Sequence, residues 1–376
     1  MDDRGCGELG GAGKGRRRHD DRRDGVQTRG LGEDAERKAE EQRPCDEWKR
    51  RSNAVPETSG SRVGRHATNL AARLLHTAGM RIVVSGVSGL IGSALVPALE
   101  AAGHEVLRLV RREASGPSEV AWDPSAGTID HDRLAGVDAA VNLNGADIGR
   151  RWSAARKREI LSSRVDSTAL LARTLASLEP RPAVLVCAGG VGIYGHDCGE
   201  EILTEDSELG SGFLAEVGRA WEAAAEPARE AGIRVVNFRQ GLVLSDRGGV
   251  LGRMRTPFRL GLGGRVGGGR QWWPWIAIDD LVAGYQAVLE SELSGPVNLT
   301  SPNPVPNTQF TRALGKALGR PTIVPAPAFG VKLLFGEMGE EALLGGQRAL
   351  PARLLESGFT FSYEELEPAL RHAIEE

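Results

Sequence analysis

A strand, a glycine-rich turn, a helix and a second strand follow one another within residues 80–112, and this order constrains the fold more than any other feature. RIVVS has the apolar character of a short buried strand, LIGSALVPALEAAG has the apolar spacing of a helix, and HEVLRLV is again typical of a strand. The turn before the helix contains Gly86, Gly89 and Gly92. A unit of this kind predicts a parallel sheet with helices on its faces.

The three glycines also predict a ligand. Glycine at these positions permits a tight turn, a close approach of the backbone to a pyrophosphate, and close packing of the helix on the strand. The N-terminus of the helix supplies N–H groups and partial positive charge for phosphates. Because the spacing occurs inside a complete strand–turn–helix–strand unit, we predict dinucleotide binding. An α/β turn without a ligand is the alternative.

The end of the second strand indicates which dinucleotide is bound. An NAD enzyme carries an acidic side chain there for the ribose 2′-hydroxyl, whereas arginine accommodates a 2′-phosphate. This chain has Arg111 and Arg112 at that place, within the sequence RLVRRE. We therefore predict NADP(H) in preference to NAD(H), with two solvated arginines as the alternative.

Strand-like and helical stretches continue to alternate along the chain. DAAVNLNG, PAVLVCAGG and IRVVNFRQGLVLS are typical of strands, whereas RKREILSSRVDSTALLARTLASL and FLAEVGRAWEAAAEPAREAG are typical of helices. This alternation predicts an α/β fold of the Rossmann type, in which a doubly wound parallel sheet binds ligands at the carboxyl ends of its strands.

Composition argues against several other classes of protein. A formal net charge of −3 gives no reason to expect a nucleic-acid partner. The four cysteines form no C-x-x-C pair and no histidine lies at zinc spacing, so we expect neither a disulfide framework nor a metal site. No apolar run reaches the roughly 18 residues of a membrane span. The acidic N-terminus lacks the apolar core of a signal peptide, so we expect a cytoplasmic protein.

Residues 1–79 differ from the rest of the chain. Arg, Asp, Glu and Gly dominate this segment, and no Ile, Phe or Tyr precedes Ile82. Such a segment buries too little apolar surface to offset the entropy of ordering it, so we expect a disordered extension. The abrupt change at Met80 favours a second interpretation, in which the natural protein starts at Met80 and the extension is not made.

Longer motifs after Met80 resemble those of one family. The chain is similar to the atypical extended short-chain dehydrogenase/reductases of the epimerase family, which are NAD-dependent epimerase/dehydratase-like proteins with a C-terminal domain of unknown function. The stretches that carry the resemblance are SGVSGLIGSAL, VNLNGADI, RRWSAARKREILSSRV, GIYG, PFRLGLGGRVGGGRQWWPWIAIDDL and LLGGQRALPARLLESGFTFSYEELEPAL. The resemblance implies a nucleotide-binding domain with a smaller substrate lobe over residues 80–322, and a helical C-terminal domain over residues 323–376.

The resemblance also implies which residues hold the cofactor. They lie in the glycine turn, after the second and fourth strands, on the following long helix and beyond the sixth strand: Gly86, Ser88, Gly89, Leu90, Ile91, Gly92, Arg111, Leu143, Asn144, Glu159, Arg164 and Val243. Asn144 departs from the small residue that is usual at its position. Without the resemblance, Glu159 and Arg164 would be interpreted as solvated residues of a charged helix.

The catalytic residues that the resemblance implies are incomplete. Extended short-chain enzymes use a Tyr-x-x-x-Lys pair, in which the lysine lowers the pKa of the tyrosine that transfers a proton. The corresponding positions fall at about Leu214 and Gly218, and neither side chain can carry a proton. Two serines usual after the fifth strand are replaced by Cys187 and Gly189. Tyr194 is left as the candidate catalytic phenol, and a packed structural tyrosine is the alternative.

The region after residue 259 concerns the substrate side. Trp272, Trp273 and Trp275 follow a glycine-rich loop, where they either form the wall of a ligand site or an aromatic cap on the smaller lobe. From about Val324 the chain is typical of amphipathic helices. We expect this appendage to pack on the main domain or to form the surface of a homodimer.

Two main hypotheses about function follow, and a structural adapter without a ligand is a third. The first is an NADP(H)-binding short-chain-type oxidoreductase, or nucleoside-diphosphate-sugar-epimerase-like protein, with an unidentified small-molecule substrate. The second is a catalytically degenerate NADP-binding sensor or scaffold that keeps the fold and the cofactor. The complete glycine turn favours ligand binding in both cases, whereas the missing Tyr–Lys pair weakens the first.

Overall fold

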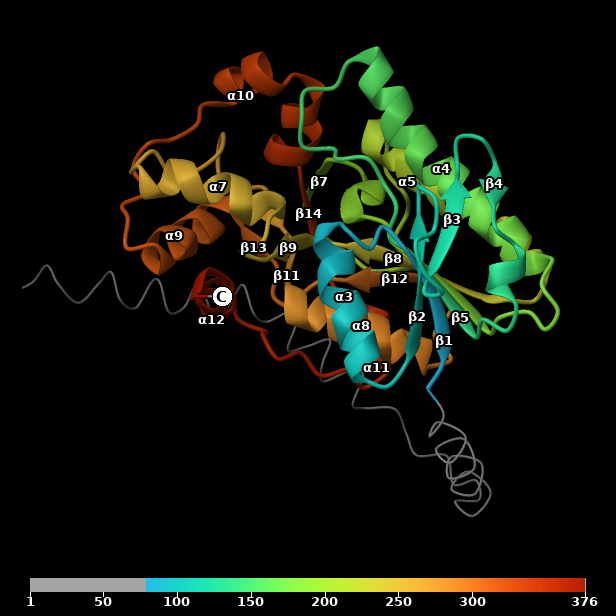
Figure 1. Cartoon of the computed structure of the whole chain (residues 1–376). Helices are drawn as coiled ribbons and strands as arrows, with labels where there is room; N and C mark the ends of the chain where they lie inside the picture. The colour runs from blue at the N-terminus through green and yellow to red at the C-terminus, as the bar shows by residue number, and fades with distance from the viewer. Residues whose placement is uncertain (1–78, 376) are drawn as a thin grey trace, which may run out of the picture. The chain divides into compact units, whose positions relative to one another are not determined.

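Eight strands form the central sheet of the computed structural model, which describes residues 79–375 (Figure 1). In spatial order they are β12 (Gly295–Leu299), β8 (Arg234–Gln240), β6 (Val184–Cys187), β5 (Ala139–Asn142), β1 (Arg81–Ser85), β2 (Glu105–Val110), β3 (Glu119–Asp123) and β4 (Thr128–Ile129). All neighbours are parallel except β4, which runs antiparallel to β3. The predicted doubly wound sheet is confirmed. The extension predicted over residues 1–79 lies outside the described residues, apart from Gly79.

Helices cover both faces of this sheet, as the alternating pattern predicts. They are α3 (Leu90–Ala101), α4 (Ala154–Ala176), α5 (Phe213–Ala223), α6 (Glu226–Glu230) and α8 (Ile278–Leu289). On one face, Leu95 of α3 and Tyr285 of α8 pack against the apolar residues of β1, β6 and β8. On the other face, Leu171 of α4 and Ala228 of α6 pack against the opposite side chains of the same strands. Burial on both faces explains why the strands read as continuous apolar runs.

Two predicted elements are each divided in the structure. The helix expected from FLAEVGRAWEAAAEPAREAG ends with α5 and restarts as α6, where Pro227 occupies the first turn. Proline has no N–H to continue the preceding helix, but it fits the start of the next one. The strand expected from IRVVNFRQGLVLS is interrupted at Gly241, where a Cβ atom would lie 2.7 Å from the Pro274 carbonyl oxygen. The chain therefore leaves the central sheet after β8.

The smaller lobe is built from the short elements that follow β8. They are β9 (Leu242–Leu244), α7 (Gly249–Arg259), β10 (Trp272–Trp273), β11 (Trp275–Ala277), β13 (Val305–Pro306) and α9 (Asn307–Ala317). The exposed fractions of Trp272, Trp273 and Trp275 are 5%, 4% and 0%. Trp273 packs edge-on against Phe310 in the core of this lobe. The burial of all three rings supports the aromatic-cap interpretation over a ligand wall.

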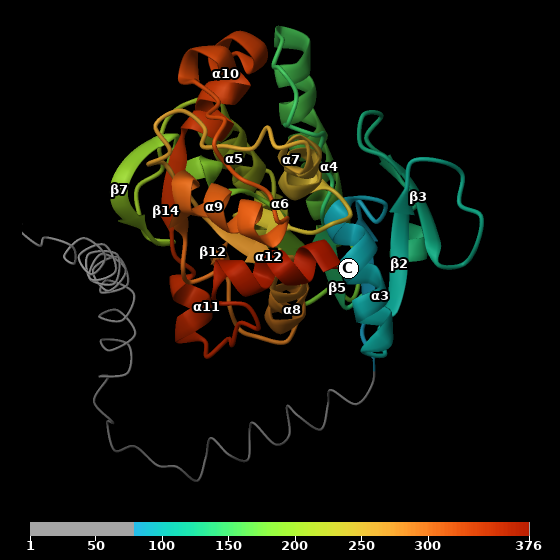
Figure 2. The same ribbon diagram turned by 90° about the vertical axis from the view of Figure 1, so that its left-hand side faces the viewer.

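The C-terminal segment joins both lobes. It contains α10 (Ala328–Phe335), the π-helical turn η3 (Gly339–Leu344), β14 (Gly346–Ala349), α11 (Ala352–Glu356) and α12 (Leu366–Glu375). The segment includes a strand as well as the expected helices, since β14 pairs in parallel with β7 (Asp197–Leu203). α12 packs beside α9 and also contacts β9 and β11 (Figure 2). This arrangement makes the segment part of the folded unit.

Candidate functional site

The turn between β1 and α3 has a shape that requires its glycines. Gly86 has a φ of 67°, and a Cβ there would lie 2.9 Å from the carbonyl carbon of Leu143 in the loop after β5. A Cβ on Gly92 would lie 2.7 Å from Val87 Cα and overlap the Gly86 carbonyl oxygen. Both contacts are with backbone, which cannot move aside as a flexible side chain can. Because neither position carries a side chain, α3 and the β5 loop can pack directly against the end of β1.

The N-terminus of α3 is open to an anion. Gly89 is the N-cap residue and donates its N–H to the Gly86 carbonyl oxygen at 3.0 Å. Within the described residues, no side chain caps this helix end, and no acidic residue lies in its first turn. The partial positive charge of the helix terminus is thus not neutralised by the protein, which suits a phosphate group.

A buried chain of hydrogen bonds supports the turn from behind. Ser85 Oγ donates to Asn142 Oδ1 at 2.6 Å and accepts the N–H of Leu143 at 3.0 Å. Asn142 Nδ2 donates to Thr168 Oγ1 at 2.7 Å, and Trp221 Nε1 donates to the same oxygen at 2.9 Å. Buried polar groups are stable only when they are paired in this way. This series of hydrogen bonds fixes the ends of β1 and β5 relative to α4 and α5.

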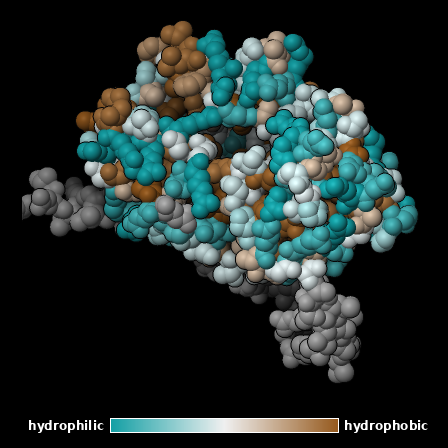
Figure 3. Space-filling view, in the orientation of Figure 1, coloured by the Kyte–Doolittle hydropathy of each residue, from teal (hydrophilic) through white to brown (hydrophobic). Residues whose placement is uncertain are grey.

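A pocket of about 320 Å³ lies at the carboxyl ends of β2, β3 and β5, and its residue Asn144 follows Leu143, which lies against Gly86 of the turn. The predicted residues that line it are Arg111, Asn144 and Glu159. Other residues also line it: Asp123, Pro124, Ser125, Gly145, Ala146, Asp147, Arg156, Ser162, Ser163 and Asp166. In the orientation of Figure 1, a hollow is visible between α7 and the start of α3 (Figure 3). Pocket and turn together offer room for an extended ligand.

The two arginines at the end of β2 have different roles. Arg111 is exposed and lines the pocket. Arg112 donates to both carboxylate oxygens of Glu119, at 2.8 and 2.6 Å, and does not line the pocket. Hydrogen bonds from Arg112 and Ser115 lower the pKa of Glu119 to about 2. Of the pair, only Arg111 is placed to meet a ligand in this pocket.

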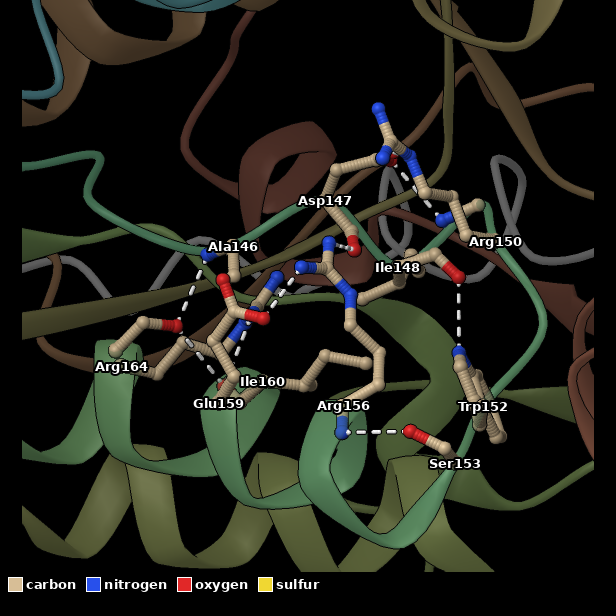
Figure 4. A network of polar contacts seen from close by, with 12 residues as sticks. Ala146, Asp147, Ile148, Arg150, Trp152, Ser153, Arg156, Glu159, Ile160 and Arg164 are labelled. Carbon is tan, nitrogen blue, oxygen red and sulfur yellow. Dashed lines mark hydrogen bonds and ion pairs between the residues drawn. The ribbon is translucent and has the colours of Figure 1, made fainter.

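The loop between β5 and α4 forms one wall of the pocket and is held by α4 (Figure 4). Asn144 Nδ2 donates to the Ser163 carbonyl oxygen at 3.1 Å, and Ser163 Oγ accepts the N–H of Ala146 at 2.9 Å. Arg156 donates to Glu159 at 2.6 Å and to the carbonyl oxygen of Asp147. The side chain of Asn144 thus anchors the loop, which gives a structural reason for its departure from the usual small residue.

Arg164 lies beneath this loop. Its guanidinium carbon is 4.9 Å from the centre of the Trp221 ring, and a Cβ on Gly145 would lie 3.0 Å from the same carbon. Nη1 donates to the Ile160 carbonyl oxygen at 3.0 Å. Desolvation by burial lowers the pKa of Arg164 to about 10, so the group stays charged at neutral pH. It places positive charge next to the β5 end of the site.

The remaining predicted cofactor residues lie around the turn. Ser88 is exposed in the turn itself, and Ile91 packs on the apolar core behind it. Leu90 contacts the start of α7, where a Cβ on Gly249 would lie 3.0 Å from its side chain. Val243 lies in β9, opposite Ile276 of β11. The structure therefore brings the turn, the β5 loop and the start of α7 together.

Tyr194 is part of a buried polar network. Only 3% of the residue is exposed, and its hydroxyl donates to Asn298 Oδ1 at 2.8 Å and accepts from Arg239 Nη1 at 3.0 Å. Arg239 in turn donates to both carboxylate oxygens of Glu222, at 2.8 and 3.0 Å. Burial raises the pKa of Tyr194. The catalytic role of this phenol stays a prediction, and its hydroxyl already has two protein partners.

The positions of the expected Tyr–Lys pair are apolar in space as well as in sequence. A Cβ on Gly218 would lie 2.8 Å from the side chain of Ile193, so α5 packs closely on the turn η2 (Val191–Tyr194). The side chain of Leu214 lies 3.0 Å from the Cβ position of Gly192. Cys187 is fully buried, and burial raises its pKa to about 12. A thiol in this state is not a nucleophile at neutral pH.

Among residues 79–375, two kinds of feature have no candidate: a metal site and a membrane-spanning helix. No group of three or more His, Cys, Asp or Glu side chains in this range could hold a metal ion. None of the helices described there is both long and apolar enough to cross a membrane.

The chain matches the models of two known protein families. A model described as the NAD dependent epimerase/dehydratase family matches residues 82–299, which is more than half of the chain. The chain belongs to the NAD-dependent epimerase/dehydratase family. A second model, described as a domain of unknown function, matches residues 326–373. The predicted family resemblance is confirmed for both parts of the chain.

Individual members of the family are similar over most of the described residues. An epimerase family protein of Mycobacterium bovis is 45% identical over 78% of this chain and 97% of its own. The crystal structure of the human epimerase family protein SDR39U1 with NADPH has 37% identity and a TM-score of 0.71, covering 79% of this chain and 99% of that one. A nucleoside-diphosphate sugar epimerase from Corynebacterium glutamicum has 38% identity and a TM-score of 0.66, covering 79% and 58%.

The family fold explains which pocket residues the sequence could have indicated. Asp123 ends a strand-like stretch, EVAWD, and the ends of parallel strands meet at the ligand edge of the sheet. Asp147 and Ser163 had no such signal, because their positions depend on how the β5 loop folds back onto α4. The epimerase/dehydratase fold thus predicts where ligands bind, while loop packing selects the side chains that reach them.

Proposed function

We propose that this chain binds NADP(H) and is a short-chain-type oxidoreductase or nucleoside-diphosphate-sugar-epimerase-like protein. The observation that carries the proposal is the position of Arg111. It is a basic residue at the carboxyl end of β2, lining a pocket beside the glycine turn. A guanidinium there is suited to a ribose 2′-phosphate, because arginine binds phosphate oxygens through paired N–H groups.

The residues present fit the dinucleotide along its length. The open N-terminus of α3 and the backbone of the glycine turn would receive the pyrophosphate. Asn144 and Glu159 would line the adenosine side, and Arg164 would add positive charge next to it. Leu90 and Val243 would direct the nicotinamide end toward the smaller lobe. When bound, the nicotinamide supplies hydride-transfer chemistry, and the protein supplies orientation and electrostatics.

Two similar structures support this assignment. The structure of the human relative contains NADPH, and it is 37% identical to this chain over 79% of its length. The relative from Corynebacterium glutamicum is described as a nucleoside-diphosphate sugar epimerase, which favours a small polar substrate. We propose the same cofactor here, with a small molecule as the substrate.

A second function is favoured by the state of the catalytic positions. Tyr194 is buried between Asn298 and Arg239, and Gly218 leaves no space for a lysine against Ile193. A protein with this arrangement could keep NADP(H) bound without turnover and act as a sensor or scaffold. Reduction of a substrate would then require a proton donor other than a Tyr–Lys pair.

Titration with both dinucleotides tests the proposal. Fluorescence of reduced nicotinamide measures binding of NADPH and NADH to the same preparation, followed by absorbance of NADPH in the presence of a library of carbonyl compounds. NADPH should bind more tightly than NADH. Oxidation of NADPH by any carbonyl compound supports the enzyme, whereas tight binding without oxidation supports the sensor. Failure to bind either dinucleotide rejects both functions, and tighter binding of NADH rejects the role of Arg111.

Three further expectations remain proposals. We propose a cytoplasmic location, which subcellular fractionation tests, and domain boundaries at residues 80–322 and 323–376, which limited proteolysis tests.

We also propose a homodimer. The side chains of Phe329, Leu333 and Leu334 on α10 are 75%, 73% and 68% exposed and form an apolar surface over that helix (Figure 3). Sedimentation equilibrium should show a dimer that Leu333→Ser weakens.

A further inference from the structure

An arginine of the smaller lobe contacts the wall of the pocket. Arg253 lies on α7, one turn after its start, and its Nη2 donates to Asp147 Oδ2 at 2.7 Å. Nη1 of the same side chain donates to the Gly149 carbonyl oxygen at 2.6 Å. Arg253 thereby connects α7 to the loop between β5 and α4, 106 residues earlier in the chain.

Both connected segments border the dinucleotide site. α7 begins at Gly249, where a Cβ would lie 3.0 Å from Leu90, the first residue of α3 after the glycine turn. Asp147 lines the pocket that also contains Arg111 and Asn144. A ligand that extends from this pocket to the glycine turn therefore lies between the two segments that Arg253 joins.

The loop is shaped to receive the guanidinium. Gly149 donates its N–H to Asp147 Oδ1 at 3.0 Å, which turns the other carboxylate oxygen toward Arg253. Arg156 holds the carbonyl oxygen of Asp147 from the side of α4 (Figure 4). A Cβ at position 149 would overlap Arg253 Nη1, so glycine is needed for the contact. The Asp147 carboxylate and the space left by Gly149 thus both suit Arg253, and Arg150 Nε lies 3.7 Å from the same Oδ2 of Asp147.

We propose that Arg253, Asp147 and Gly149 form a strap across the bound dinucleotide and set how fast it enters and leaves. This inference rests on the NADP(H) site proposed above. The side chains of Arg253 and Asp147 are 52% and 43% exposed, so their ion pair is weak and is screened by salt. A weak, exposed contact opens readily, which allows the ligand to exchange while the contact slows that exchange.

The test measures the rates of NADPH binding and release by stopped-flow fluorescence. Gly149→Ala displaces the guanidinium without a change of charge, and Arg253→Ala removes it. Both variants should release NADPH about two- to fivefold faster, in line with an exposed ion pair. Gly149→Ala should also bind NADPH faster, because opening then no longer limits entry. Arg259→Ala is the matched control, since it removes an exposed arginine from the last turn of the same helix.

Salt gives a second readout. Raising the NaCl concentration should speed release from the wild-type protein more than from Gly149→Ala, whose strap is already open. Release rates equal to the wild type in both strap variants overturn the inference, and so does an equal acceleration in Arg259→Ala. If the wild-type protein binds NADPH and neither variant changes the rate of its release, only the strap is rejected. A wild-type protein that binds no NADPH rejects the proposed function and the strap with it.

Discussion

The carboxylate of Glu341 lies at the N-terminus of α5, where its Oε1 accepts the N–H of Phe213 at 2.8 Å. Its Oε2 accepts the next N–H of the helix, from Leu214, at 2.9 Å. The N-cap residue of α5, Gly212, has no side chain and a φ of 102°, so the helix cannot cap itself. An acidic group at this end also matches the helix dipole. A residue of the C-terminal segment therefore completes a helix of the nucleotide-binding domain.

Removal of this cap should destabilise the whole fold. We expect Glu341→Ala to lower the free energy of unfolding by about 1–2 kcal/mol, the usual effect of losing an N-cap acceptor. Urea denaturation followed by circular dichroism measures the change. Glu340→Ala is the control, because the side chain of Glu340 forms a surface ion pair with Lys332 and does not cap α5. Equal stability of Glu341→Ala and the wild type would show that the cap is not needed.

Arg111 and Arg112 should differ in their effect on the cofactor. Arg111→Ala should weaken NADPH binding about 10- to 100-fold, as expected when a charge-assisted hydrogen bond to phosphate is lost. NADH has no 2′-phosphate, so its binding should change little. Arg112→Ala should leave NADPH binding close to that of the wild type, because Arg112 is held by Glu119. Isothermal titration calorimetry distinguishes these outcomes, and a larger loss in Arg112→Ala would contradict them.

Substitution in the glycine turn should separate strain from ligand binding. Gly86→Ala places a side chain at a φ of 67° and 2.9 Å from the Leu143 backbone, so it should abolish NADPH binding and destabilise the fold. Gly103 has a φ of 88°, but among residues 79–375 no atom beyond its immediate chain neighbours lies within 4 Å of its Cβ position. Gly103→Ala should therefore show the strain of a positive φ while NADPH still binds. Normal binding by Gly86→Ala would rule out the turn as the pyrophosphate site.

The Arg112–Glu119 pair should make stability depend on pH in the acid range. Arg112 and Ser115 lower the pKa of Glu119 in the folded protein to about 2, from an ordinary value of 4.5. A lowered carboxyl pKa stabilises the folded state above pH 4.5, and the contribution is lost as the pH falls from 4.5 toward 2. The wild type should thus be more stable than Glu119→Gln at neutral pH, and the difference should shrink over this range. A constant difference in unfolding free energy across the range would disprove this role.

The sequence predicted the glycine turn better than the surroundings of Tyr194. The glycine spacing and the strand runs are local features, since burial on both faces imposes apolar residues and a tight turn imposes glycine. The sequence also indicated that Leu214 and Gly218 had replaced proton-carrying residues. It could not show that Tyr194 is engaged by Asn298 and Arg239, which lie 104 and 45 residues away in the chain.

By itself, the sequence indicated the doubly wound sheet, the glycine turn and the basic end of β2, because the pattern that predicts each is formed by residues close together along the chain. Only the tertiary structure decided that Arg111 lines the pocket while Arg112 pairs with Glu119, and that Glu341 caps α5. These choices depend on which loop or helix end a side chain meets after folding. The Glu341 cap joins residues 128 positions apart, and even the Arg112–Glu119 pair, seven residues apart, depends on how the chain turns between β2 and β3.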